Sequence, residues 1–222
     1  MRFDREAPGS PAPRLVAIVA ALVVAALGVL YFAGGSLGAF DGQAEPMDGL
    51  QGPWRGVALV VDFCGEPAGS TVLTVVVVLT CLLLRRFRLA GVAVVGIALT
   101  VASTTVLKPV VDRTIHGDYL SYPSGHTAFA TSLALILAAL TIDVFRLTRG
   151  LAILVTLAMV IPAGTTMGWA EVMLSAHYPT DAVGGFFTAL AAVPAAAWLV
   201  DRIASRLPRR RSATPPKPPV TS

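Results

Sequence analysis

Two histidines stand in short polar segments whose residue types suit phosphoryl transfer. His126 ends the sequence YPSGH, and His177 begins the sequence HYPTD, in which Asp181 is the last residue. An imidazole can attack phosphorus or donate a proton to a departing oxygen, and a carboxylate can orient the ring by binding one of its nitrogens. Two apolar stretches of membrane length separate the segments, so we expect both imidazoles to lie on one membrane face.

The first segment is expected to open a helix with free backbone donors. Ser124 follows a proline and precedes an apolar run, as an N-cap residue does, and the next backbone N–H groups then have no helical partner. A helix start of this kind can bind an anion, and Gly125 lets the backbone approach it closely. His126 then lies on the first turn, where it can protonate a leaving oxygen. Pro179 is expected to open the helix that follows His177.

Two cations lie upstream of these motifs. Lys108 closes an apolar stretch and, as a compact charge at the membrane surface, could hold a phosphate oxygen. Arg113, five residues later, could add a second contact. Each feature alone has an ordinary explanation, such as an interfacial lysine, a helix cap or a structural histidine. Their conjunction in a chain with three histidines indicates a phosphate site.

The elements that position these residues are predicted to be membrane-spanning helices. The chain of 222 residues is 55% hydrophobic and 14% charged, with a mean hydropathy of +0.73, which excludes an ordinary water-soluble domain. We therefore expect an all-α polytopic fold, a bundle of six transmembrane helices. The predicted spans are Leu15–Ala33, Ala68–Leu84, Leu89–Leu107, Thr127–Val144, Leu151–Met167 and Ala182–Val200.

The basic residues predict how the chain crosses the membrane. Most of the 17 lysines and arginines lie before the first span, between the second and third, between the fourth and fifth, or after the sixth. By the positive-inside rule these segments are cytoplasmic, so we expect both termini inside and the site at the outer, extracytoplasmic face of the cell membrane. The net charge of +4 comes from this asymmetry, and we expect the bilayer as a partner and no nucleic acid.

Three regions are expected along the chain. They are a cytoplasmic tail over residues 1–14, the six-helix membrane domain over 15–200, and a basic, proline-rich cytoplasmic tail over 201–222, which we expect to be disordered and to touch anionic lipid. The first span is longer than the roughly 7–15 apolar residues of a signal peptide, so we expect a retained anchor. The outer segment 34–69 is expected to form either a cap or a half-inserted helix.

Together these residues resemble the type 2 phosphatidic acid phosphatase superfamily of membrane lipid phosphatases. The family pattern is a Lys followed by Arg, then Pro-Ser-Gly-His, then Ser-Arg, five residues, His, three residues and Asp. By that likeness His177 is the nucleophile that becomes a phosphohistidine, Asp181 orients it, and His126 is the acid for the leaving group. The phosphate holders would be Lys108, Ser124 and Gly125. The resemblance implies hydrolysis of a lipid phosphate or polyprenyl diphosphate.

The chain departs from that pattern at its arginines. It has Ile115-His116 where the first motif ends in Arg-Pro, and Ala170-Glu171 where the third begins with Ser-Arg, which leaves Arg113 as the nearby guanidinium. Such arginines neutralise the transferring phosphoryl group. An acidic Glu171 beside a phosphate would repel it, so we predict that Glu171 pairs with Lys108 or Arg113, or points away from His177.

Four functions remain open on these residues. The first is a lipid phosphatase with Lys108 and Arg113 holding the phosphate. The second is a phosphodiester head-group transferase, as in the sphingomyelin-synthase-like branch, and the third a catalytically silent relative that binds lipid phosphate or a protein partner. An intramembrane serine protease using Ser124 and His177 is disfavoured, because Ser124 has no Gly-x-Ser-x-Gly elbow around it and Asp181 is left without a role.

No cofactor is expected. Cys64 and Cys81 fall in an outer segment and inside a span, so we predict neither a disulfide nor a metal site from them, and phosphohistidine chemistry needs no metal. The substrate candidates are polyprenyl diphosphate, phosphatidic acid and phosphatidylglycerophosphate, long-tailed anions that could enter sideways between helices. The sequence names no protein partner.

Overall fold

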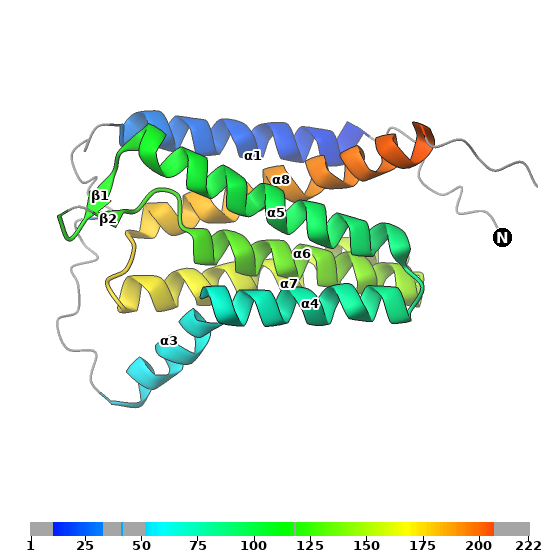
Figure 1. Ribbon diagram of the computed structural model, residues 1–222, viewed down its shortest axis with the longest axis horizontal. Helices are drawn as coiled ribbons and strands as arrows, with labels where there is room; N and C mark the ends of the chain where they lie inside the picture. Colours follow the sequence, from blue (N-terminus) through cyan, green and yellow to red (C-terminus); the bar gives the residue numbers. More distant parts are fainter. Residues whose placement is uncertain (1–10, 33–40, 42–51, 118, 207–222) are drawn as a thin grey trace, which may run out of the picture.

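The computed structural model describes residues 11–32, 41, 52–117 and 119–206, and most of these residues are helical (Figure 1). Predictions about the chain termini, residues 1–10 and 207–222, lie outside the described residues. A short antiparallel hairpin joins α5 to α6 and pairs Thr114 with Leu120. The elements are α1 (Pro11–Leu30), α3 (Pro53–Phe63), α4 (Pro67–Leu83), α5 (Phe87–Val111), β1 (Thr114–Ile115), β2 (Tyr119–Leu120), α6 (Gly125–Phe145), α7 (Arg149–Met173) and α8 (Pro179–Arg206).

The described helices confirm the predicted all-α membrane fold. Five of them, α1, α5, α6, α7 and α8, are long and apolar enough to span a bilayer. The pair α3 and α4 passes the same test together but is bent by 58° at its break, so the described part of the chain has six spans if the pair counts as one. Prolines at the first positions of α3 and α4 suit helix starts, since a proline there removes no helical hydrogen bond.

The helices place both described ends of the chain together. The start of α1 and the end of α8 lie at one end of the bundle, and the β1–β2 hairpin lies at the other (Figure 1). If the α3–α4 pair counts as one span, six spans return the chain to its starting face. That both termini share one side stays a prediction. Which side faces the cytoplasm stays a prediction from the basic residues.

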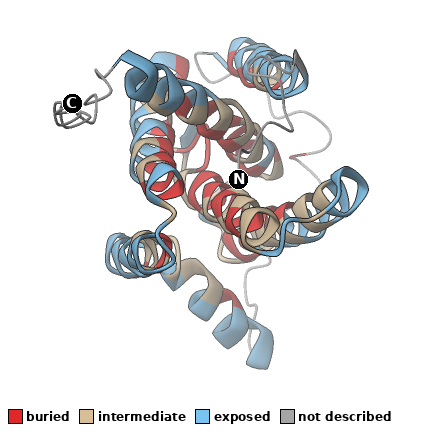
Figure 2. Cartoon of the chain, turned by 90° about the vertical axis from the view of Figure 1, so that its right-hand side faces the viewer, coloured by how far each residue is buried: buried red, intermediate tan, exposed pale blue. Residues whose placement is uncertain are grey.

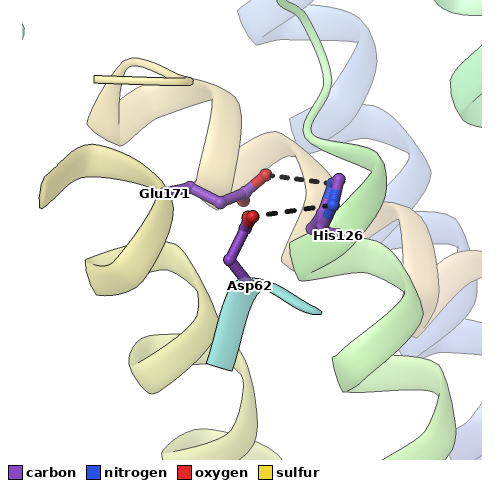
Figure 3. A group of neighbouring side chains, drawn as sticks. All are labelled: Asp62, His126 and Glu171. Atoms are coloured by element: carbon purple, nitrogen blue, oxygen red, sulfur yellow. Dashed lines mark ion pairs between the residues drawn. The ribbon is translucent and has the colours of Figure 1, made fainter. Parts of the chain in front are cut away.

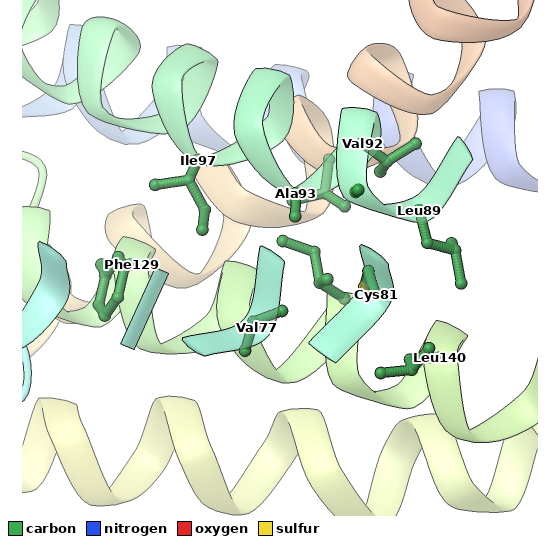
Figure 4. Close-up of a cluster of buried hydrophobic side chains, with 11 residues drawn as sticks. Val77, Cys81, Leu89, Val92, Ala93, Ile97, Phe129 and Leu140 are labelled. Carbon is green, nitrogen blue, oxygen red and sulfur yellow. The ribbon is translucent and has the colours of Figure 1, made fainter. Parts of the chain in front are cut away.

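The interior is apolar and packed, and the outer surface is apolar as well. One buried cluster joins α4, α5, α6 and α8, with Val77, Cys81, Ile97 and Phe129 among its members (Figure 4). Exposed faces still carry large apolar side chains along α1, α4 and α7, while buried residues line the inner faces (Figure 2). An apolar exterior of this kind fits contact with lipid tails.

Gly185 allows a close approach of α8 to the residue that precedes α6. A Cβ added there would lie 2.4 Å from the carbonyl oxygen of Ser124, so the backbone that precedes α6 leaves no room for a side chain. Gly185→Ala is therefore expected to destabilise the protein by about 1–3 kcal/mol, the usual cost of overpacking. Thermal unfolding of the purified protein in detergent measures the loss.

Gly150→Ala is the matched control for this change. Gly150 is an exposed helical glycine in α7, and a Cβ added there meets nothing within 4 Å. We expect no loss, or a gain of up to about 1 kcal/mol from better helix propensity. Equal unfolding temperatures for the two variants would contradict the assigned close approach.

Candidate active site

The N-termini of α6 and α8 are joined by a backbone hydrogen bond. Ser124 caps α6 and accepts a hydrogen bond from the Thr127 N–H at 3.0 Å, and its own N–H donates to the Asp181 carbonyl at 3.0 Å. Buried Tyr122 donates its hydroxyl to the Val24 carbonyl of α1 at 2.7 Å, which anchors the preceding loop. The predicted N-cap at Ser124 is confirmed, as is the predicted start of the last helix at Pro179.

The two motif histidines meet at the carboxylate of Glu171. Glu171 Oε1 lies 3.3 Å from His177 Nε2 and 3.5 Å from His126 Nδ1. Its other oxygen, Oε2, accepts hydrogen bonds from the Ser124 hydroxyl and, at 2.7 Å, from the Thr127 hydroxyl. The structure thus brings His126 and His177 to one point, as the motif spacing predicted.

The prediction for Glu171 itself was wrong. Glu171 faces His177, and within the described residues it pairs with neither Lys108 nor Arg113. The reason is its place in the last turns of α7, on the side packed against α6. There the side chain is fully buried and reaches hydroxyl donors on α6, whereas Arg113 has carboxylate partners of its own.

Asp181 lies behind the His177 ring, on the side away from Glu171. The distance from His177 Nδ1 to Asp181 Oδ2 is 3.6 Å, which is too long for a hydrogen bond. The same oxygen accepts the Tyr178 N–H at 3.0 Å. Hydrogen bonds of catalytic groups are often long before substrate binds, so this geometry suits an orienting carboxylate on Nδ1 while Nε2 faces the centre of the site.

Arg113 is part of a buried ion network. One of its terminal nitrogens, Nη1, donates to Asp181 Oδ1 at 2.6 Å and to Thr180 Oγ1 at 2.7 Å, and the other, Nη2, donates to Asp41 Oδ2 at 2.7 Å. The guanidinium also lies over the ring of Tyr31, 3.9 Å from its centroid. Only 2% of Arg113 is exposed. The sequence predicted that Arg113 contacts the phosphate directly, but in the structure it holds Asp181 instead.

Asp41 is a member of this network that the sequence did not reveal. It accepts the Thr180 N–H at 3.1 Å and the Thr180 hydroxyl at 2.7 Å. Burial by itself would raise the pKa of Asp41, but the hydrogen bonds from Thr180 and Arg113 outweigh it and lower the pKa below its ordinary value. Asp41 therefore stays charged and keeps Arg113 aimed at Asp181.

Lys108 lies in the last turn of α5, and Gly125 is the first residue of α6. The Lys108 side chain is half-buried and forms no ion pair with any residue in the described ranges. One turn earlier on α5, Thr104 faces the start of α6, because a Cβ added to Gly125 would lie 3.9 Å from Thr104 Oγ1. No other atom described here comes within 4 Å of that Cβ, so the N-terminus of α6 is uncrowded at Gly125.

The end of α3 and the start of α4 add two acidic residues that sequence reasoning missed. Asp62 Oδ1 and Glu66 Oε1 each lie 3.8 Å from His126 Nε2. In the described part of segment 34–69, α3 is a helix bent away from α4 and packed on α7, where Trp54 contacts Trp169 edge-on. Whether it is a cap or a half-inserted helix stays open between the two predictions. No motif spacing could have revealed Asp62, because its contact depends on that bend.

The ion network predicts a large cost for removing its cation. Arg113→Met leaves Asp41 and Asp181 buried without their charge partner, which typically costs about 3–5 kcal/mol. We expect a correspondingly lower unfolding temperature of the purified protein. Arg88→Met is the control, because Arg88 binds Asp201 at 2.5 Å in a pair that is about half exposed, and exposed pairs contribute at most about 1 kcal/mol. Similar losses in both variants would refute the structural importance of Arg113.

Comparisons with known proteins identify the family of this chain. The family model of the PAP2 superfamily matches residues 89–204, more than half of the chain. The chain is also similar to the crystal structure of the first transmembrane PAP2-type phosphatidylglycerolphosphate phosphatase from Bacillus subtilis, with a TM-score of 0.63 at 19% identity, covering 91% of this chain and 100% of that chain. A search of curated proteins gave no match. The chain therefore belongs to the PAP2 superfamily and has its transmembrane phosphatase fold.

Proposed function

We propose that this protein is an integral membrane lipid phosphatase that cleaves a lipid phosphate or polyprenyl diphosphate through a phosphohistidine. Membership in the family supports lipid phosphatase chemistry at the general level. The observation that carries the finer proposal is the convergence of His177 Nε2 and His126 Nδ1 on one oxygen of Glu171, at 3.3 and 3.5 Å. Two imidazoles this close can serve one phosphoryl group, one as nucleophile and the other as acid.

The reaction takes two steps. His177 Nε2 attacks phosphorus and forms a P–N bond, while the P–O bond to the lipid breaks and its electron pair leaves with the oxygen. His126 gives this oxygen a proton. In the second step His126 takes a proton from water, the water oxygen attacks phosphorus, and the P–N bond breaks to release phosphate. Asp181 faces Nδ1 of His177 and stabilises the positive charge that the ring carries in between.

The phosphate is held by groups around the start of α6. We assign this role to the free backbone donors at Gly125, to the Ser124 hydroxyl, and to the ammonium of Lys108. The Ser124 hydroxyl donates to Glu171 in the structure, so it must turn toward the substrate when a phosphate enters. Arg113 acts through Asp181. The positive-inside rule gives the site an extracytoplasmic location in the cell membrane.

One observation favours a second candidate, a catalytically silent relative. The buried Glu171 carboxylate faces both imidazoles, where an entering phosphate dianion would meet a like charge. A relative that only binds a lipid phosphate or a protein partner would not need this site to transfer a phosphoryl group. Phosphate release distinguishes the two candidates.

The test is phosphate release by the purified full chain from a panel of lipid phosphates. Phosphatidylglycerophosphate comes first, because the similar solved structure is named for it, followed by phosphatidic acid and a polyprenyl diphosphate. Reactions run with added Zn²⁺ or Mn²⁺ and, in parallel, with a chelator, so that activity is measured both with and without a divalent ion. Phosphate release from any of these lipids above the His177→Ala background supports the proposal. Absence of release from all of them under both conditions refutes it and supports the silent relative.

A further inference from the structure

Three helices distant in sequence bring metal-ligating side chains together at His126. Asp62 comes from α3, His126 from the first turn of α6 and Glu171 from α7 (Figure 3). One ligand atom from each lies within 4.8 Å of the others. Figure 3 shows both carboxylates pointing at the imidazole, each from a different helix. The set combines one nitrogen and two oxygen donors.

Two polar atoms aimed into this cluster lack a hydrogen-bond partner among the described residues. They are Oε1 of Glu171, which is fully buried, and Nε2 of His126. The two oxygens of Glu171 differ sharply, since Oε2 accepts two hydroxyl hydrogen bonds and Oε1 accepts none. A buried carboxylate oxygen without a donor is costly, and buried charges are normally paired or coordinate a metal.

The charges of the cluster call for a cation. Three carboxylates, those of Asp62, Glu66 and Glu171, lie within 3.8 Å of a nitrogen of His126. The buried guanidinium beside the site, that of Arg113, is already bound to Asp41 and Asp181. With both imidazoles neutral, the carboxylates around His126 carry more negative charge than the cations bound to them neutralise.

We propose that Asp62, His126 and Glu171 bind one divalent first-row transition ion, with Zn²⁺ and Mn²⁺ as the matching class. Imidazole nitrogen with carboxylate oxygens suits these ions, and such ligands lie about 2.0–2.2 Å from the metal. Small side-chain rotations close the cluster from its present spread of up to 4.8 Å. Three protein ligands leave an open position for water or for a phosphate oxygen, as in catalytic sites.

The ion would supply positive charge at Glu171, where the family pattern has an arginine. Bound to the Glu171 carboxylate, it turns a repulsive group into a holder of a phosphoryl oxygen and leaves His177 free as nucleophile. An ion on His126 also occupies the nitrogen that would donate the proton. The leaving oxygen then takes its proton from a water on the ion, and the hydroxide left behind attacks the phosphohistidine. This catalytic use rests on the proposed function, whereas ion binding does not.

Direct binding measurements test the site without substrate. The purified full chain is stripped with a chelator and dialysed against Zn²⁺ or Mn²⁺, and the bound metal is determined by elemental analysis. We expect about one ion per chain. We also expect Asp62→Asn, Glu171→Gln and His126→Ala each to weaken binding by about tenfold or more, since even outer ligand partners contribute tenfold to hundredfold. Asp201→Asn and His116→Ala, which change a carboxylate and a histidine outside the cluster, should keep the wild-type affinity.

Thermal unfolding adds a readout that separates binding from folding. Added ion should raise the unfolding temperature of wild type and Asp201→Asn but not that of Asp62→Asn. The metal site is overturned if wild type retains no ion. It is also overturned if Asp62→Asn and His126→Ala retain as much ion as wild type does. Ion binding with no lipid turnover overturns the proposed function alone, and lipid turnover by wild type that retains no ion after dialysis against Zn²⁺ or Mn²⁺ overturns the metal site alone.

Discussion

His177→Ala is expected to abolish lipid-phosphate turnover, with a fall on the order of 10⁴-fold or more. The variant removes the nitrogen that forms the bond to phosphorus. This nitrogen, Nε2 of His177, faces the site and lies 3.3 Å from Glu171 Oε1. Asp181→Asn should keep measurable turnover, because it misplaces the ring without removing the nucleophile. Initial rates of phosphate release by purified variants measure both effects.

Asp201→Asn is the control for these variants. Asp201 lies near the end of α8, opposite to the site, and forms a half-exposed pair with Arg88. We expect wild-type turnover from it. Because Asp181 also binds Arg113, its variant needs an unfolding measurement to show that the loss is catalytic. Turnover in His177→Ala equal to that of wild type would refute the nucleophile assignment.

Glu171→Arg is expected to raise turnover of lipid monophosphates in chelated protein by roughly tenfold or more. Preorganised positive groups facing a developing anion contribute about 10²–10³ in rate, and this change replaces a carboxylate with a guanidinium between two imidazoles. The same variant should lose the metal ion and become insensitive to chelators. Phosphate release with and without added Zn²⁺ or Mn²⁺ measures both outcomes.

Glu171→Gln is the matched variant that removes the charge and keeps the shape. If an ion on Glu171 supplies the positive charge, Glu171→Gln turns over more slowly than wild type in the presence of metal. If the carboxylate merely repels phosphate, Glu171→Gln turns over faster. No gain in Glu171→Arg, together with an inactive wild type across the lipid panel, would favour the silent relative.

Helical content and the meeting of the two motifs could be predicted from the chain alone. A helix of membrane length carries the chain across to the opposite face, and a second one brings it back. Two spans between His126 and His177 therefore place both rings on one side. Local chemistry likewise identified the cap at Ser124, since a serine after proline and before an apolar run accepts the N–H that the first turn leaves free.

The partners of Arg113 and Glu171 could not be predicted in this way. The sequence places Arg113 five residues after Lys108, which suggested a phosphate contact, but the short hairpin after α5 carries it to Asp41 and Asp181. Glu171 was expected to seek a cation because acidic groups repel phosphate. Its neighbours are set instead by which face of α7 packs on α6.

The sequence by itself indicated a helical membrane protein of the PAP2 superfamily, with His126, His177 and Asp181 close together. These conclusions follow from apolar run lengths and short motifs, which are local properties of the chain. Only the tertiary structure decided that Glu171 faces both histidines and that Asp62 joins them. Helices that are apolar on nearly all sides do not reveal which face turns inward, so such contacts depend on rotation and bending that only packing sets.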